Sequence, residues 1–312
     1  MKKRLPKKIK ALLRLPVSKL SAIADGVRDE NVSGHLELCT ILNAKSGACS
    51  EDCKFCAQSH RHRTGIKAYP LKSKREIFTA AAAAKKNGAG RFGIVTSGND
   101  LTKRDLTRIA ECAKEITKKI GIKVCASLGS LSEDDLRLLK KSGVNRYHHN
   151  IETSPRYFRK IVTTHTFEER LRTIRLAQKA GLEVCSGGII GMGETWRDRI
   201  EMALILKELG VDSVPINILV AIDGTSLEGS NKISSTDAIK TIAIFRIILK
   251  DKTVKIAAGR ESILKDFQGM ALMSGANGML IGGYLTVMGR SIKEDKKLAE
   301  TIEKAWKKQK NF

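Results

Sequence analysis

Three cysteines stand close together in the sequence, at Cys49, Cys53 and Cys56, with the spacing C-x3-C-x2-C. A structural zinc site usually needs four ligands, and this cysteine triplet has no second pair at the usual distance, although His60 or His62 could supply a fourth ligand. Three thiolates can instead hold three irons of a cubane cluster and leave the fourth iron open to a substrate or cofactor. Because the segment is polar and turn-like, three plain core cysteines are the less favoured interpretation.

The composition excludes several other classes of protein. The 312 residues can bury a large core, 42% are hydrophobic, and seven cysteines are too few for a disulfide scaffold. The formal net charge of +24 can mark a nucleic-acid or membrane-surface protein. The lysines, however, mingle with acidic residues, and aromatic residues make up only 4%. A lysine-rich solvated surface is therefore favoured over nucleic-acid binding.

The first twenty residues begin like a secretory signal, but Lys10, Arg14, Pro16 and Lys19 interrupt them before an apolar run can form. No apolar stretch elsewhere reaches the roughly 18 residues of a membrane span. We therefore expect no membrane partner and a cytoplasmic location, where thiols stay reduced.

Short β-branched or glycine-ended runs alternate with longer amphipathic ones along the chain. This alternation predicts right-handed β-α-β units and a parallel sheet, and eight strand candidates predict an α/β fold of the (β/α)8 TIM-barrel type. An open doubly wound sheet is the alternative, but no Gly-x-Gly-x-x-Gly turn follows the first strand. Residues 1–34 are expected to form an N-terminal helical extension, and residues 35–312 a single barrel domain. The predicted strands are Leu36–Leu42, Arg91–Thr96, Lys123–Ser127, Arg146–Ile151, Glu183–Ile190, Ser213–Leu219, Val254–Ala258 and Gly278–Ile281.

The predicted helices have recognisable ends. The first of them stops before Gly88, a favourable helix terminus. Ser132 precedes three acidic residues, which suit the positive end of a helix dipole, and Thr166 with Glu169 resembles a capping box. The predicted helices are Lys72–Asn87, Asp105–Thr117, Ser132–Lys141, Thr166–Lys179, Thr195–Leu209, Ser235–Ile248 and Glu294–Lys307.

Polar and glycine residues gather where the predicted strands end. In a parallel barrel these ends form the active-site face. Residues of this kind are the cysteine triplet, Ser97, Asn99, Asn150, Glu152, Gly187–Glu194, Asn217 and Gly259–Glu261.

Six segments, in order along the chain, carry a family likeness. They are NAKSGACSEDCKFCAQS (Asn43–Ser59), YHHNIETS (Tyr147–Ser154), TTHTFEER (Thr163–Arg170), VCSGGIIGMGET (Val184–Thr195), VPINILVAIDGTSLEG (Val214–Gly229) and AAGRE (Ala257–Glu261). The first looks like the cluster-binding loop of radical S-adenosylmethionine enzymes, and together the six resemble the biotin synthases. A C-x3-C-x2-C triplet alone marks a superfamily of many reactions, so the ordered run of segments is the more specific signal.

The resemblance implies a sulfurtransferase that inserts sulfur into dethiobiotin to form biotin. The cysteine triplet would ligate a [4Fe–4S] cluster whose open iron is chelated by S-adenosylmethionine. One-electron reduction would cleave that cofactor to methionine and a 5′-deoxyadenosyl radical, which abstracts hydrogen from unactivated carbons. The residues implied to bind S-adenosylmethionine are Phe55, Asn150, Glu152, Arg170, Gly188 and Asn217. Those implied to contact dethiobiotin are Lys45, His148, Asn150 and Asn217.

The family also carries an auxiliary iron–sulfur cluster, the implied sulfur donor, held by three cysteines and an arginine on successive strands. Cys125, Cys185 and Arg260 match this pattern, but the position on the second strand is Gly93, which has no side chain to bind iron. Cys39 lies in the neighbouring first strand, about 4.8 Å away. We hypothesise that Cys39 joins Cys125 and Cys185 around an auxiliary cluster of the [2Fe–2S] or a variant type, with Arg260 near or on it. The alternative is that Cys39 is a small core residue.

Two other functions remain open at this point. Gly93, and His148 where the family has asparagine, allow another sulfur-inserting radical enzyme, such as a lipoyl-synthase-like activity on octanoyl groups. A basic zinc- or RNA-binding protein is the non-enzymatic alternative, but it leaves the strand-end residues without a role. The resemblance further implies an electron donor such as flavodoxin or ferredoxin and a homodimer, with no nucleic-acid partner. Cys112, inside a predicted helix, is expected to be structural.

Overall fold

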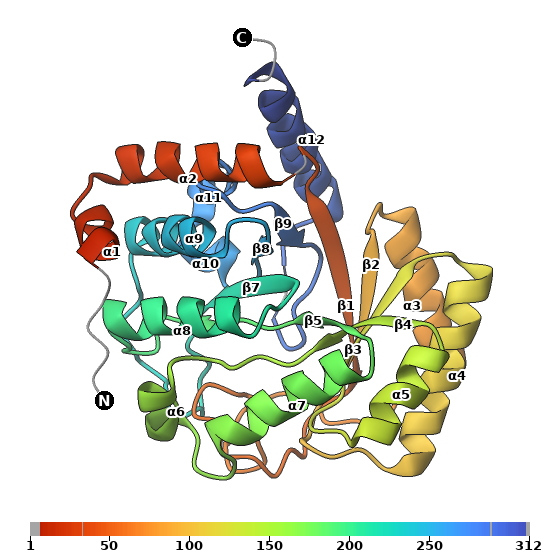
Figure 1. Ribbon diagram of the computed structural model, residues 1–312. Helices are drawn as coiled ribbons and strands as arrows, with labels where there is room; N and C mark the ends of the chain where they lie inside the picture. The colour runs from red at the N-terminus through yellow and green to blue at the C-terminus, as the bar shows by residue number, and fades with distance from the viewer. Residues whose placement is uncertain (1–6, 33, 288, 310–312) are drawn as a thin grey trace.

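The computed structural model describes residues 7–32, 34–287 and 289–309 (Figure 1). Its strands pair in parallel in the order β5-β4-β3-β2-β1-β9-β8-β7-β6, and β5 also pairs with β7. This last pairing closes the sheet, and the predicted (β/α)8 barrel is confirmed. The strands are β1 (Glu37–Lys45), β2 (Arg91–Thr96), β3 (Lys123–Ser127), β4 (Val144–His148), β5 (Glu183–Cys185), β6 (Gly188–Ile190), β7 (Ser213–Ile218), β8 (Thr253–Ile256) and β9 (Gly278–Leu280).

The fifth predicted strand, Glu183–Ile190, is interrupted and becomes β5 and β6. The break contains Gly187, where an added Cβ would lie 1.9 Å from the carbonyl oxygen of Pro215 in β7. Only glycine lets two backbones approach this closely. Because β5 and β6 both pair with β7, together they occupy one place in the eight-stranded barrel.

Helices cover the outside of the barrel, and several begin at side chains that cap them. Ser73 and Glu76 form a capping box at α3, and Thr166 and Glu169 form the predicted one at α7. These side chains bind backbone N–H groups that the first helical turn leaves free. The helices are α1 (Lys7–Leu13), α2 (Val17–Asn31), α3 (Lys74–Lys86), α4 (Lys103–Lys119), α5 (Glu133–Lys141), α6 (Pro155–Ile161), α7 (Phe167–Lys179), α8 (Trp196–Glu208), α9 (Ser235–Leu249), α10 (Arg260–Ile263), α11 (Gln268–Leu272) and α12 (Ile292–Gln309).

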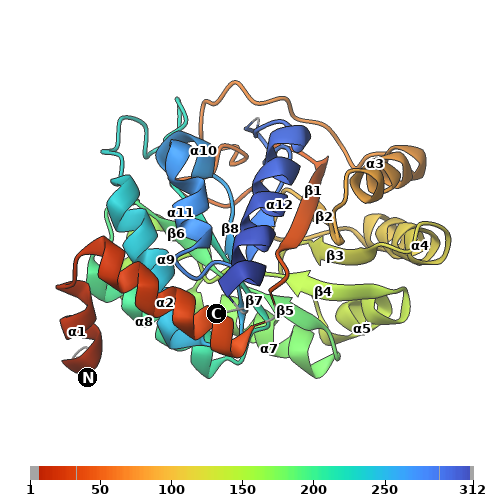
Figure 2. The same ribbon diagram turned by 90° about the horizontal axis from the view of Figure 1, so that it is seen from above.

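Helices α2 and α12, from opposite ends of the sequence, lie against each other at one end of the barrel. Helix α2 packs on α9 and α12 stands beside β1, whereas the long loop after β1 lies at the opposite end of the barrel (Figure 1 and Figure 2). The buried guanidinium of Arg28 in α2 lies 4.2 Å from the ring centre of Trp306 in α12. Leu36, just before β1, donates its N–H to Glu303 of α12 at 2.9 Å. No helix in the described ranges is long and apolar enough to cross a membrane.

A buried carboxylate ties the segment after β4 to α8. Asp198, fully buried, accepts hydrogen bonds from the Ser154 hydroxyl at 2.6 Å and the Thr195 N–H at 2.8 Å. It also forms an ion pair with Arg156 at 2.6 Å. Burial by itself would raise the pKa of Asp198, but these donors outweigh it and hold the pKa below its usual range.

We expect Asp198→Asn to lower the free energy of unfolding by about 1–3 kcal/mol at pH 7, because hydrogen-bond donors lose their charged partner. Since the folded-state pKa is depressed, the carboxylate stabilises the fold above its unfolded pKa of about 3.9, and that contribution is lost as the pH falls through the folded value. Urea unfolding of both proteins should therefore give a difference that shrinks from pH 7 toward low pH. A difference that stays constant, or matches that of the exposed Asp134→Asn control, would contradict this assignment.

Candidate active site in the barrel

A cavity of about 440 Å³ occupies the barrel interior, a volume suited to a small-molecule site. All six cysteines singled out as cluster ligands line it, and none forms a disulfide. Three lie on the loop after β1 and three on the strands: Cys49, Cys53 and Cys56, and Cys39, Cys125 and Cys185. Cys112 instead lies buried in α4, packed in the hydrophobic core.

The loop that carries the cysteine triplet is held by its own backbone. The N–H of Cys49 donates to the Gln58 carbonyl at 3.1 Å, and the N–H of His60 donates back to the Cys49 carbonyl at 2.8 Å. Ala48, just before the first cysteine, has a φ of 52°. A residue with a Cβ stays in this left-handed conformation only where its surroundings hold it. The first cysteine of the triplet therefore projects from a tightly constrained backbone.

His60 and His62, the candidate fourth ligands of a zinc ion, bind this loop. Their Nδ1 atoms lie 2.8 Å and 2.9 Å from the carbonyl oxygens of Cys49 and Cys56. A carbonyl oxygen can only accept, so Nδ1 carries the proton in both rings. Neither histidine lines the cavity, and the triplet is thus a set of three thiols held in place by two imidazoles.

Burial raises the pKa of two of the triplet thiols, those of Cys53 and Cys56. Desolvation raises the pKa of Cys56 to about 11, and it raises that of Cys53 further, with the neighbouring sulfurs adding to the increase. Both groups are therefore protonated at neutral pH in the metal-free chain, and binding iron must release their protons. Within the described ranges no three Cys, His, Asp or Glu side chains are grouped as ligands of one metal ion. In a cubane cluster each thiolate binds a different iron.

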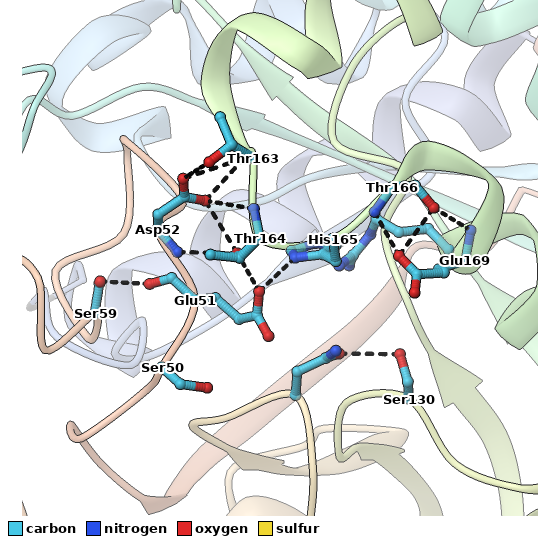
Figure 3. A network of polar contacts seen from close by, with 12 residues as sticks. Ser50, Glu51, Asp52, Ser59, Ser130, Thr163, Thr164, His165, Thr166 and Glu169 are labelled. Atoms are coloured by element: carbon cyan, nitrogen blue, oxygen red, sulfur yellow. Dashed lines mark hydrogen bonds and ion pairs between the residues drawn. The ribbon is translucent and has the colours of Figure 1, made fainter.

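Asp52, inside the triplet, fastens the loop to the connection between α6 and α7 (Figure 3). Its carboxylate accepts the N–H of Thr163 at 2.9 Å, the N–H of Thr164 at 3.2 Å and the Thr163 hydroxyl. The N–H of Lys54 donates to the Ile161 carbonyl at 3.0 Å. Burial would raise the pKa of Asp52, but these hydrogen bonds hold it well below its usual range.

Arg170 of α7 is bound on three sides at the cavity wall. Its Nε donates to the Asn150 carbonyl, its Nη1 lies 3.1 Å from His165 Nε2, and its Nη2 lies 3.5 Å from Glu152 Oε1. His165 in turn lies 2.7 Å from Glu51 of the cysteine loop through its Nδ1. The orientation of the guanidinium is therefore set by two segments of the chain, the one after β4 and the one before α7.

Glu152 also occupies a left-handed conformation, with a φ of 64°. Its N–H donates to the Gly187 carbonyl at 3.1 Å, and its carbonyl accepts the N–H of Ile189 at 2.9 Å. The Asn150 side chain spans the same segments, donating to Glu152 at 3.4 Å and accepting the Gly187 N–H at 3.1 Å. Strained residues held by their surroundings are typical of functional sites.

Gly188 packs against this segment and does not line the cavity, contrary to its expected place beside the cofactor. An added Cβ would lie 2.2 Å from the Glu152 carbonyl oxygen and 2.5 Å from Met202 Sδ. Asn217 does line the cavity. Its amide donates to the Gly188 carbonyl at 3.3 Å and accepts the Ala258 N–H at 3.2 Å, which fixes the orientation of the amide.

Cys39, Cys125 and Cys185 project from β1, β3 and β5. Side chains from alternate strands share a layer in this type of barrel, which explains why all three line the same cavity. His148 is the register partner of Cys185 and forms a hydrogen bond with it. Burial would raise the pKa of Cys185, but His148 and buried cations such as Lys255 lower it to about 6.

Gly93 in β2 lies in register with Ile41 of β1 and Cys125 of β3. An added Cβ would lie 3.0 Å from Ile41 Cγ2, so a side chain at this position would have to displace Ile41 slightly. The second strand therefore contributes no thiol, whereas Cys39 on the first strand does reach the cavity.

Five charged side chains form a charged floor beneath these sulfurs. The Glu37 carboxylate contacts Arg91 at 2.8 Å, Arg146 at 2.9 Å and Lys255 at 2.5 Å. Glu183 contacts Arg91 and Arg146, each at 2.9 Å. The Lys255 ammonium also donates to Cys39 Sγ at 2.9 Å. Three cations thus face two carboxylates, and the surplus positive charge lies next to the thiols.

Besides Gly188, two other expected residues lie away from the cavity wall. Arg260 is fully buried between α10 and α12, where it binds Tyr284 at 2.7 Å and Asp295 at 2.7 Å. The basic side chain that contacts a sulfur of the strand set is Lys255. Lys45, at the end of β1, is likewise absent from the cavity lining. In the sequence, Lys255 could have been noticed as the one charged residue in the otherwise apolar predicted strand Val254–Ala258.

The sequence of this chain matches known protein families and individual enzymes. The pattern of the Radical SAM superfamily matches residues 44–206, and that of the Biotin and Thiamin Synthesis associated domain matches residues 215–303. Biotin synthase of Thermotoga petrophila is 53% identical over 86% of this chain and 89% of its own length. That of Heliobacterium modesticaldum is 47% identical over 88% and 85%.

Solved structures agree on the fold. Methylornithine synthase superposes with a TM-score of 0.82, at 21% identity, over 94% of this chain and 91% of its own. An FeFe-hydrogenase maturase from Carboxydothermus hydrogenoformans gives a TM-score of 0.76, at 20% identity, over 95% of this chain and 76% of its own. At these identities the likeness concerns the barrel alone.

Asp52→Asn should loosen the attachment of the cysteine loop. The N–H groups of Thr163 and Thr164 lose a charged acceptor, and we expect their hydrogen exchange to accelerate roughly tenfold, the equivalent of about 1.4 kcal/mol. Hydrogen exchange followed by mass spectrometry measures this on the metal-free chain. Asp134→Asn, at an exposed position of α5, is the matched control. Unchanged exchange at both threonines would contradict the proposed attachment.

Proposed function

This chain belongs to the biotin synthases of the radical S-adenosylmethionine superfamily, and from that membership we propose how its own residues divide the work. The enzyme inserts sulfur into dethiobiotin and uses S-adenosylmethionine and a [4Fe–4S] cluster. When bound, these groups supply one-electron cleavage of S-adenosylmethionine and hydrogen abstraction from unactivated carbons. The protein contributes ligands, orientation and shielding from water.

One observation carries the proposal: two sets of three thiols share a single cavity. One set is on the loop after β1, which backbone hydrogen bonds hold in place. The other set is on strands whose register is set by the sheet. Radical generation and sulfur donation need two iron–sulfur groups with the substrate between them. A cavity with thiols from two separate parts of the barrel suits that requirement.

We assign the [4Fe–4S] ligands to the cysteine triplet and the binding of S-adenosylmethionine to the residues around Arg170. A guanidinium matches a carboxylate geometrically, and Arg170 already has a fixed orientation. Glu152 and Asn150 supply acceptors and donors for ribose hydroxyl groups. Phe55 lies in the cavity lining next to the last cysteine, where its ring suits the adenine.

The auxiliary cluster is assigned to Cys39, Cys125 and Cys185. Their thiols fit an iron–sulfur group in donor type. His148 and the buried cations lower the pKa of Cys185 to about 6, whereas burial raises the pKa of Cys39 and Cys125, so binding iron there must release protons. Lys255, in contact with Cys39, takes the place at these sulfurs that the family pattern suggested for Arg260.

Dethiobiotin carries a cyclic urea, which both donates and accepts hydrogen bonds. Asn150, Asn217 and His148 line the cavity that both thiol sets share, and amide side chains offer both kinds of group. We propose these three residues as the urea site. Lys45 lies outside the cavity lining, so the proposed urea site consists of the three lining residues.

The remaining assignments concern the location, redox partner, oligomeric state and domain organisation of the enzyme. We propose a cytoplasmic location, an electron donor such as flavodoxin or ferredoxin, and a homodimer. We also propose that residues 1–34 are an extension to one catalytic barrel, since both matching family patterns cover parts of the same closed sheet.

Iron and acid-labile sulfide per chain test the two thiol sets directly. Anaerobically reconstituted wild type should contain two clusters, and Cys39→Ala and Cys49→Ala should each lose one of them. Cys112→Ala, whose thiol lies in α4, should keep both. If Cys39→Ala retains the full iron and sulfide content, Cys39 is a core residue and the auxiliary assignment fails.

Product analysis separates the two roles. With dethiobiotin and a chemical reductant, the wild type should form biotin and 5′-deoxyadenosine. Cys49→Ala should form neither, because S-adenosylmethionine is not cleaved. Cys39→Ala should still form 5′-deoxyadenosine but no biotin, because the sulfur donor is missing. Biotin formation by Cys39→Ala would contradict the proposal, and an octanoyl substrate serves as the negative control for the wild type.

A further inference from the structure

We propose that His165 is a positioning residue that couples the cysteine loop to Arg170. The inference rests on the proposed role of Arg170 in binding the carboxylate of S-adenosylmethionine. His165 belongs to the TTHTFEER segment, and none of the assignments above uses its imidazole.

Both ring nitrogens of His165 are engaged, each by a different part of the site. Nδ1 lies 2.7 Å from Oε2 of Glu51, a residue located between the first two cysteines of the triplet. Nε2 lies 3.1 Å from Nη1 of Arg170. The imidazole is therefore the direct bridge between the loop of the cluster ligands and the guanidinium.

The chemistry of the two partners selects one form of the ring. A carboxylate only accepts hydrogen bonds, and a guanidinium only donates them. Nδ1 must therefore carry a proton toward Glu51, and Nε2 must present its lone pair to Arg170. This is the neutral Nδ1–H tautomer, and no other form of the ring satisfies both contacts.

The surroundings keep the ring in this position. His165 is only 9% exposed. The ring of Phe158 meets it edge to face, with the ring centres 5.6 Å apart. Thr164, the residue before His165, donates hydrogen bonds to Asp52. The backbone beside His165 is therefore attached to the same cysteine loop.

The bridge has a direct consequence for Arg170. Its Nε is bound to the Asn150 carbonyl and its Nη2 faces Glu152, and His165 holds the remaining branch of the fork. Small errors in the orientation of such a group reduce binding and catalysis strongly. The position of the cysteine loop is thereby transmitted to the cofactor carboxylate site through Glu51 and His165.

Affinity for S-adenosylmethionine, measured by anaerobic equilibrium dialysis on the reconstituted enzyme, tests this coupling. We expect His165→Ala to weaken binding roughly 10- to 100-fold, with unchanged iron content per chain. His165→Gln, which keeps one donor and one acceptor, should recover part of the affinity. His35→Gln is the matched control, because His35 is exposed and pairs only with Glu303 among the described residues.

A double-mutant cycle with Glu51 distinguishes a bridge from two independent effects. If the coupling runs through the imidazole, Glu51→Gln combined with His165→Ala should bind no more weakly than His165→Ala alone. Additive losses would overturn the proposal, as would affinity within twofold of wild type for His165→Ala. Nitrogen-15 spectra of the metal-free chain should show the Nδ1–H tautomer at this histidine, and the opposite tautomer would also overturn it.

Arg170→Ala separates failure of this inference from failure of the proposed function. If Arg170→Ala binds S-adenosylmethionine normally, the assignment of the carboxylate site is wrong. If Arg170→Ala loses affinity while His165→Ala does not, the carboxylate site stands and only the coupling fails.

Discussion

The interior of this barrel depends on the neutralisation of three buried cations. Arg91, Arg146 and Lys255 would be very unfavourable inside a protein without partners, and the carboxylates of Glu37 and Glu183 supply them. The five groups come from five different strands, so the ion pairs also hold the strand register. Breaking one pair would leave an uncompensated buried charge, the costly case for such networks.

The positive charge left over after these ion pairs form acts on the thiols next to the charged floor. A cation next to a buried thiol favours the ionised form, and desolvation opposes it. Desolvation prevails at Cys39, where the pKa is raised although Lys255 contacts the sulfur directly, and it raises the pKa of Cys125 to about 12. The pKa of Cys185 falls to about 6 in the same environment, despite its burial. Away from the floor, burial raises the pKa of Cys56 to about 11. Within the strand set, Cys185 is therefore the thiol that ionises most readily, because His148 and Lys255 both act on it.

The two sets also differ in how they are held. Strand hydrogen bonds position the deep thiols, whereas the triplet depends on polar contacts between loops, including those of Asp52 and Glu51 with the segment before α7. Loops that carry function on a rigid barrel are the usual arrangement in this fold. Here the loop contacts pass through His165 to Arg170, which links the position of the triplet to the geometry of the neighbouring binding groups.

The sequence by itself determined the features that depend on local spacing. The cysteine triplet, the strand–helix alternation and the caps at Ser132 and Thr166 are short-range patterns, and the structure contains them. Which of Arg260 and Lys255 contacts the sulfurs depends on the tertiary structure. Both stand near the end of the same strand, and only the sheet register directs Lys255 to Cys39 while Arg260 packs between helices. The bridge from Glu51 to His165 joins residues more than a hundred positions apart. Contacts of this kind are set by the closure of the barrel, because spacing along a chain carries no information on which distant strands become neighbours.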